Sequence, residues 1–275
     1  MLSRKKEEHK KLVAVVVPLS TRNTFLPEEE ISLRHIQRFL DRYDKYFVIP
    51  EGLDISYPGF QTRCFNRRYF GSVAANTKLM LSAKFYESFK DYRYLLLHHL
   101  DSLVFSDQLA QWCNEDYDYI GSPWIEFEGE AYSELQRNKV GNGGLSLRKI
   151  ESFLDVFYSK QYWEDPSRSW QSLRSAHSIV GSFVRLPRVI LKYMRFSNNA
   201  RSEMAHYPWN EDIFWANRAA HYYPEFKIAP VDAALRFAFE CHPRRCFERN
   251  ESRVPFGCHA WQKYDREFWE PYILQ

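Results

Sequence analysis

Residues 94–105 (YLLLHHLDSLVF) restrict the possible folds of this chain more than any other stretch. They begin as an almost continuous run of bulky apolar side chains that is too short for a helix of a bundle. Such a run is typical of a strand buried on both faces, as in a parallel sheet covered by helices. We therefore expect a central sheet with helices on both sides.

Asp101 follows this apolar run, after His98 and His99. A carboxylate at the end of a central strand is costly unless a cation or several donors accompany it. Because ligands of open α/β sheets bind beyond the carboxyl ends of the strands, Asp101 is a candidate anchor for a binding site. The alternative is that Asp101 caps a helix beginning near Asp107. The strand pattern alone leaves both open.

The order of elements near the N-terminus favours a parallel sheet. Residues 12–19 (LVAVVVPL) form a second apolar run, and residues 46–49 form a short third one. Between them, Pro27 and the three acids after it begin a predicted helix, because proline and negative charge are favoured in a first helical turn. This β-α-β order predicts parallel strands. We further expect a loop at 57–72, helices at 74–89, 107–114, 211–220 and 263–272, short strands at 118–120 and 226–229, and a strand or turn at 255–261.

Composition excludes several classes of protein. The 275 residues, 45% of them apolar, suffice for one large domain or two small ones. A net charge of only +3 argues against a nucleic-acid partner. The aromatic content of 17% suits a cleft that stacks on rings or sugars, and equally an aromatic core. Five irregularly spaced cysteines predict reduced thiols.

The sequence also carries information on location. Residues 1–11 form a charged tail without the apolar segment of a signal peptide, and no run approaches the roughly 20 apolar residues that span a bilayer. We expect a cytoplasmic protein with peripheral contact at the inner face of the membrane. That contact would involve residues 170–200, where arginines alternate with apolar side chains, a pattern that suits a membrane surface or a phosphate-bearing ligand. The alternative is a helical excursion whose basic face is solvated.

Three later motifs supply polar groups. Residues 141–144 (GNGG) allow a close approach of the backbone to a ligand, and a helix predicted after them would direct its N–H groups toward the loop. The alternative is a tight turn. Glu211 and Asp212 lie at a predicted helix start, where the dipole favours ionised acids. His259 lies within residues 255–261 (PFGCHAW).

Taken in chain order, these motifs resemble the bacterial domain-of-unknown-function family 5672. The matching segments cover most of the chain outside residues 1–11 and 150–207; they are VVVPL at 15–19, ISLRHI at 31–36, PEGLD at 50–54, KLMLSAKFYESF at 78–89, LDSLVF at 100–105, YDYIGSPW at 117–124, VGNGGLSLRK at 140–149, NEDIFW at 210–215 and PFGCHAW at 255–261. The same order also resembles glycosyltransferases of the GT-A fold. The resemblance implies one α/β domain, residues 12–275, that is GT-A-like (Rossmann-like), with a mostly parallel central sheet flanked by helices and a helical insertion at 150–208.

The resemblance further implies that the chain transfers a sugar from a nucleoside-diphosphate donor to a hydroxyl of a glycan or lipid-linked acceptor. Asp101 and His259 would bind a divalent metal, Mn²⁺ or Mg²⁺, and Asp212 or Glu211 would be the general base of an inverting displacement. The donor would contact Asp101 and residues of two loops: Pro18, Ser20, Asn142, Gly143 and Gly144. The chain departs from the usual Asp-x-Asp pattern, because His99 and Leu103 occupy the partner positions of Asp101. Asp107, His99 or His259 would then complete the metal site, or arginines would replace the metal.

Two further classes remain as alternatives. The first is a non-catalytic binding module for zinc or a nucleotide sugar, in which Cys241, Cys246, Cys258 and His259 would hold the zinc. Their spacing matches no familiar zinc ribbon or finger. The second is nucleic-acid binding through the basic segment, which the near-neutral net charge disfavours.

Overall fold

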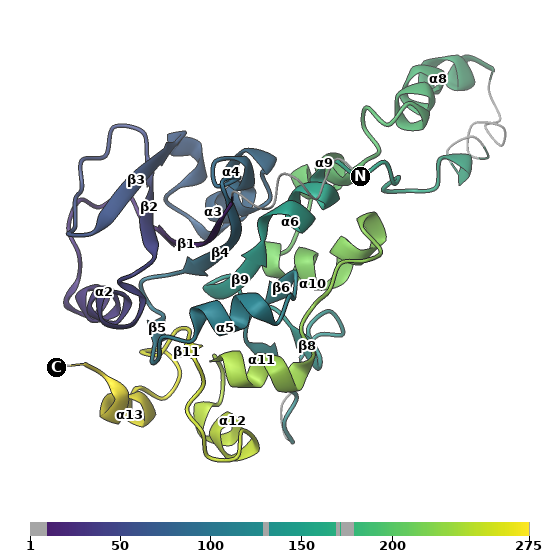
Figure 1. Cartoon of the computed structure of the whole chain (residues 1–275). Helices are drawn as coiled ribbons and strands as arrows, with labels where there is room; N and C mark the ends of the chain where they lie inside the picture. The colour runs from purple at the N-terminus through teal and green to yellow at the C-terminus, as the bar shows by residue number, and fades with distance from the viewer. Residues whose placement is uncertain (1–9, 129–131, 169–170, 172–178, 275) are drawn as a thin grey trace.

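The computed structural model describes residues 10–128, 132–168, 171 and 179–274, which form a six-stranded sheet covered by helices (Figure 1). In spatial order the strands are β3 (Phe60–Phe65), β2 (Asp44–Pro50), β1 (Lys11–Pro18), β4 (Tyr92–His98), β9 (Leu145–Lys149) and β6 (Tyr119–Ile120). The first four run parallel, and β9 and β6 are antiparallel to their neighbours. The predicted α/β class with a mostly parallel central sheet is confirmed.

The two apolar runs that the sequence singled out are the central strands. Val15 of β1 pairs with Leu96 of β4, and both are completely buried. Side chains of successive strand residues point to opposite faces, so a run without polar breaks fits only a strand covered on both sides. Bulky β-branched and leucine side chains therefore fix these strands at the centre of the sheet.

Helices cover both faces of the sheet. On one face, α3 (Val73–Met80), α4 (Ala83–Glu87), α6 (Ile150–Phe157) and α10 (Glu211–Tyr222) pack on Val16 and Leu97. On the other face, α2 (Pro27–Leu40), α5 (Leu109–Asn114) and α11 (Val231–Phe237) pack on Val15 and Leu96. Helix α2 faces the core through Leu33, Ile36 and Leu40.

A second, three-stranded sheet joins distant parts of the chain. It consists of β10 (Ala238–Phe239), β11 (Gly257–Cys258) and β5 (Leu103–Val104), with Cys258 paired to both Phe239 and Leu103. Glu240 directly follows β10, His259 directly follows β11, and Asp101 lies two residues before β5. Because β10 and β11 are parallel and β5 is antiparallel, all three polar residues lie at one end of this small sheet.

Four local predictions differ from the structure. The segment after the glycine-rich loop is strand β9, not a helix, because the alternation Leu145-Ser146-Leu147 has the period of a strand and pairs with β4. The expected loop at 57–72 contains edge strand β3. The helix expected at 74–89 is interrupted at Leu81, so that α3 and α4 are separate. Residues 226–229 contribute a single bridge, from Ile228 to Tyr119.

The remaining elements lie at the periphery; they are η1 (Arg67–Tyr69), β7 (Pro123–Trp124), β8 (Lys139–Val140), α8 (Ile179–Tyr193), α9 (Ala200–Ala205), α12 (Pro243–Arg249), α13 (Arg266–Trp269) and η2 (Glu270–Tyr272). Helix α8 projects away from the sheet as an arm (Figure 1). The insertion predicted at 150–208 includes this arm together with α6 and α9, whereas the charged tail lies outside the described residues except for its last two. None of the described helices has the combined length and apolarity that crossing a bilayer requires.

Candidate active site

A cleft opens at the carboxyl ends of β1 and β4. It has a volume of about 680 Å³, and its walls come from the loop after β1, the start of α3 and the loop after β4. Pro18 and Ser20 line it together with His99 and Asp101. The structure therefore brings the end of the first strand and the polar end of the central strand into one cavity, the position where open α/β sheets bind ligands.

Three side chains at the edge of this cleft form a group that can hold a metal ion. One ligand atom from each of His99, Asp101 and His259 lies within 4.8 Å of the other two. The Nε2 atom of His259 lies 3.4 Å from Oδ1 of Asp101, and the rings of the two histidines are 5.9 Å apart. Two imidazoles and a carboxylate are a donor set that suits Mn²⁺ and other divalent cations.

Glu240 supports this group from behind, and the sequence reasoning missed it. Nδ1 of His259 lies 2.9 Å from Oε1 of Glu240, so the carboxylate orients the ring whose other nitrogen faces Asp101. A carboxylate on the far nitrogen of a histidine is the usual outer partner of a metal ligand. Glu240 follows the mostly apolar segment 233–239 (AALRFAF), in which Arg236 is the one charged residue, and this position was the signal available in the sequence.

The charges of this group stabilise one another. Burial disfavours the imidazolium of His259, but hydrogen bonds to Asp101 and Glu240 raise its pKa to about 10. Partial burial opposes ionisation of Asp101, yet the hydrogen bond to His259 outweighs it and holds the pKa of Asp101 well below its usual range. Burial lowers the pKa of His99 to about 4, so His99 is neutral and has a lone pair for a cation.

The glycine-rich loop packs directly against these residues. A Cβ atom on Gly144 would overlap the imidazole of His259, and one on Gly143 would lie 2.6 Å from Oε1 of Glu211. Asn142, with a φ of 81°, accepts the N–H of Gly144 at 2.7 Å and donates to Ser122 at 2.8 Å. Asn142 therefore shapes the turn, and both glycines are required by close packing.

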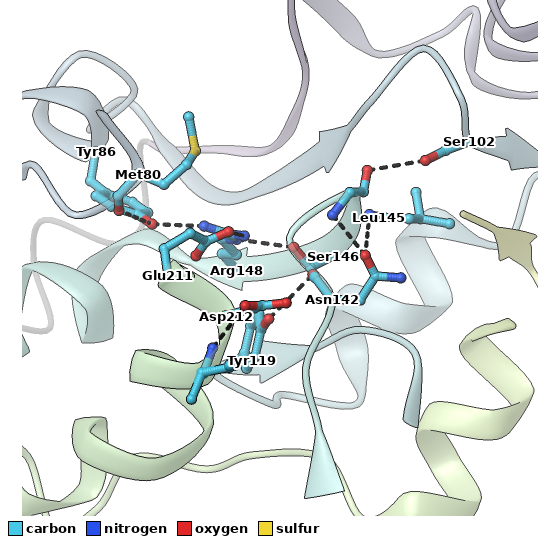
Figure 2. Close-up of polar contacts among 12 residues, drawn as sticks. Met80, Tyr86, Ser102, Tyr119, Asn142, Leu145, Ser146, Arg148, Glu211 and Asp212 are labelled. Atoms are coloured by element: carbon cyan, nitrogen blue, oxygen red, sulfur yellow. Dashed lines mark hydrogen bonds and ion pairs between the residues drawn. The ribbon is translucent and has the colours of Figure 1, made fainter. Parts of the chain in front are cut away.

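Glu211 lies in a buried ion pair beside the loop (Figure 2). Its Oε1 accepts from Nη2 of Arg148 at 2.8 Å, and Arg148 also donates to Tyr86 at 2.9 Å and to Ser146 at 3.0 Å. Arg148 is completely buried. Oε2 of Glu211 finds no hydrogen-bond partner within the described part of the chain. An ion pair of this kind fixes the orientation of the Glu211 carboxylate.

Asp212 differs from Glu211 because, among the described residues, no cation forms an ion pair with it. Burial, Glu211 and Glu240 together raise the pKa of Asp212 to about 7. Its Oδ1 accepts the N–H of Ile213 at 2.9 Å. A carboxyl group that titrates near neutrality is well suited to accept and release a proton.

Other residues considered from the sequence lie elsewhere. Asp107 forms an ion pair with Arg42 at 3.0 Å on the surface. None of the cysteines joins the metal-binding group, which is the single group of this kind in the described residues. Cys258 is buried within β11, and burial raises the pKa of its thiol well above the usual value. This arrangement gives no support to a zinc module.

Comparisons with known proteins show the family of this chain. A family model described as "Protein of unknown function (DUF5672)" matches residues 59–259, more than half of the chain. No curated protein sequence matches. Similar solved structures include the apo form of glycosyltransferase GlyE from Streptococcus pneumoniae TIGR4, with 12% identity, a TM-score of 0.47 and coverage of 97% of this chain and 60% of GlyE.

Two further solved structures are similar to this chain. An active-site mutant of LgtC has 13% identity and a TM-score of 0.46, with 90% of this chain and 86% of LgtC covered. A glycosyltransferase involved in glycosylation of the major capsid of PBCV-1 has 9% identity and a TM-score of 0.43. The match covers 95% of this chain and 98% of that protein. The chain thus spans 60% of the length of GlyE and most of the other two.

Proposed function

The chain belongs to the DUF5672 family, as its sequence motifs indicated, and we propose that it is a glycosyltransferase that uses a nucleoside-diphosphate sugar. The observation that carries the proposal is the convergence of His99, Asp101 and His259 at the edge of a 680 Å³ cleft. A cleft of this size accommodates a nucleotide sugar, since ligand pockets usually measure about 300–1,000 Å³.

The donor would lie across the carboxyl ends of the central strands. Its nucleoside would occupy the cleft beside Pro18 and Ser20, and its diphosphate would face Asp101 and His259. His99, Asp101 and His259 would hold Mn²⁺ or Mg²⁺, which would neutralise charge on the leaving diphosphate. Gly143 and Gly144 would let the loop pack closely against Glu211 and His259, so that the loop lies beside the position proposed for the donor sugar.

Asp212 would act as the general base. In an inverting, in-line displacement, the acceptor hydroxyl attacks the anomeric carbon, its proton passes to a carboxylate oxygen of Asp212, and the bond to the diphosphate breaks with its electron pair on the leaving oxygen. The pKa of about 7 for Asp212 fits this role. Glu211, held by Arg148, would instead orient the start of α10 and the loop.

The arm would bring the enzyme to an anionic membrane surface that carries a lipid-linked acceptor. Its described end exposes apolar side chains next to cations; Ile190, Leu191, Tyr193, Met194 and Phe196 are exposed, as are Arg188 and Arg195. Apolar side chains with basic neighbours favour the interface of an anionic bilayer. Residues 170 and 172–178 of the predicted segment lie outside the described residues.

A ligand screen tests the central proposal. We expect one nucleoside diphosphate to raise the melting temperature of the full chain, with a larger rise when Mn²⁺ is present, because a ligand of the native state stabilises it by mass action. Asp101→Ala should abolish both the Mn²⁺-dependent rise and sugar transfer while the far-UV spectrum stays native. Unchanged turnover in that variant would remove Asp101 from the mechanism, and nucleotide binding without any turnover would instead favour a non-catalytic binding module.

A further inference from the structure

A second cavity lies immediately before helix α10. It measures about 260 Å³ and is lined by aromatic rings and a few polar groups; the residues are Leu135, Trp163, Glu203, His206, Tyr207, Pro208, Trp209 and Arg218. Its volume falls below the about 300 Å³ at which sites for drug-sized ligands begin, so it suits one sugar unit better than a nucleotide.

The walls of this cavity present flat aromatic surfaces. Trp209 is 55% exposed, an unusual state for the largest apolar side chain. The rings of Trp163 and His206 are nearly parallel, with an angle of 12° between their planes. Tyr207 is held by an edge contact with Phe214, whose ring centroid is 5.1 Å away. Exposed and half-buried aromatic rings around one cavity form a surface suited to stacking with a ligand.

Charged groups occupy the inner edge of the same cavity. Glu203 accepts from Nε of Arg218 at 2.6 Å and from its Nη2 at 3.2 Å, and Tyr222 donates a further hydrogen bond to Glu203. The cavity therefore combines apolar faces with donors and acceptors at the edge. A pyranose ring has the same division, with C–H groups on its faces and hydroxyls around its rim.

We propose that this aromatic pocket binds a pyranose unit of the acceptor glycan, stacked on Trp209. The proposal rests on the glycosyltransferase function proposed above and names the acceptor chemistry as a neutral sugar ring rather than a lipid head group or a peptide. Because a flat ring face recognises C–H groups of several sugars, the pocket selects pyranoses in general, and the polar rim selects among them.

The position of the pocket along the chain supports this assignment. Trp209 precedes Asp212 by three residues, and each residue spans at most about 3.6 Å, so their Cα atoms are within roughly 11 Å. Asn210 between them has an extended backbone with a ψ of 155°. The stacking residue Trp209 is therefore close in the chain to Asp212, the carboxylate that would accept the proton of the acceptor hydroxyl.

Saturation-transfer NMR on the full chain tests the pocket without requiring sugar transfer. The probes are the methyl α- and β-pyranosides of glucose and galactose. We expect transfer to the ring C–H protons of at least one probe, with binding about tenfold weaker in Trp209→Ala and in Trp163→Ala, as the loss of one stacking partner predicts. Phe196→Ala, which removes a more exposed ring on the arm, should leave binding unchanged.

The possible outcomes distinguish a failure of the acceptor pocket from a failure of the proposed transferase function. No transfer to any of the four glycosides, or equal binding by wild type and Trp209→Ala, would overturn the acceptor pocket, whereas the nucleotide-dependent melting shift would still stand. Melting temperatures of the variants check folding. When an acceptor is identified, Trp209→Ala should raise its KM while leaving kcat and donor hydrolysis nearly unchanged.

Discussion

Gly144 lies directly against the imidazole of His259, so that any side chain at Gly144 would occupy the space of the ring. The two residues come from different sheets, since Gly144 precedes β9 and His259 follows β11. The carbonyl of Gly144 also accepts the N–H of His99 at 2.7 Å. The glycine-rich loop is therefore a wall of the proposed metal site, and the first prediction follows from this contact.

Gly144→Ala should weaken Mn²⁺ binding more than it weakens the fold. The added methyl group must displace His259, and disturbances of this kind around a metal ligand typically cost about 10–100-fold in affinity. Calorimetric titration with Mn²⁺ measures the effect, and the melting temperature in the absence of metal is the control. Equal Mn²⁺ affinity in the variant would show that His259 does not bind the ion.

Glu240→Gln should reduce Mn²⁺ affinity by a similar factor of about 10–100, because the ring of His259 loses its charged partner. Glu248→Gln, an exposed change on the neighbouring helix α12, is the matched control. The same titration separates the two variants. If both bind Mn²⁺ as the wild type does, Glu240 has no role in the site.

Arg148→Met should destabilise the protein by about 3–5 kcal/mol, because it leaves the buried carboxylate of Glu211 without its cation. The double variant Arg148→Met with Glu211→Gln should recover part of this loss, since no buried charge remains. Urea unfolding monitored by tryptophan fluorescence gives both values. A double variant that is less stable than Arg148→Met would contradict an unpaired charge as the cause.

The pH dependence of stability should change in Asp212→Asn. The pKa of Asp212 is about 7 in the folded chain, against an ordinary value of 3.8, so the folded state binds this proton more tightly. Asp212 therefore favours folding fully below about pH 4, and this contribution is lost as the pH rises toward 7. Between pH 5 and pH 8, the free energy of unfolding should fall more for the wild type than for Asp212→Asn. An equal fall in both proteins would place the pKa of Asp212 at its ordinary value.

The arm should bind vesicles that contain anionic lipid. High salt should release it, because salt screens the attraction between the lipid and the side chains of Arg188 and Arg195. Flotation of the full chain with phosphatidylserine vesicles measures this. Met194→Ser with Phe196→Ser should reduce the bound fraction several-fold by removing the apolar contact. Leu26→Ser, a change at an exposed apolar residue near the cleft, serves as the comparison. Chain that stays unbound at low salt would refute membrane docking.

Local pattern accounts for most of the fold. The unbroken apolar runs predicted β1 and β4, and the proline and acids at the start of α2 predicted that helix, because side-chain burial and helix termini act over a few residues. Strand β9 was mistaken for a helix because five residues are too few to separate the two periods without knowledge of the neighbouring strand.

The sequence by itself determined which positions near strand ends carry a charged or titratable side chain and which are glycines. Asp101, His259 and the glycines at 143 and 144 were chosen as candidates on this basis. Only the tertiary structure decided how they meet. Pairing of β11 with β10 and β5 places His259 between Asp101 and Glu240, and packing of Arg148 against Glu211 leaves Asp212 as the acid that titrates near neutrality. These relationships depend on contacts between segments far apart in the chain, and local side-chain preferences do not encode such distances.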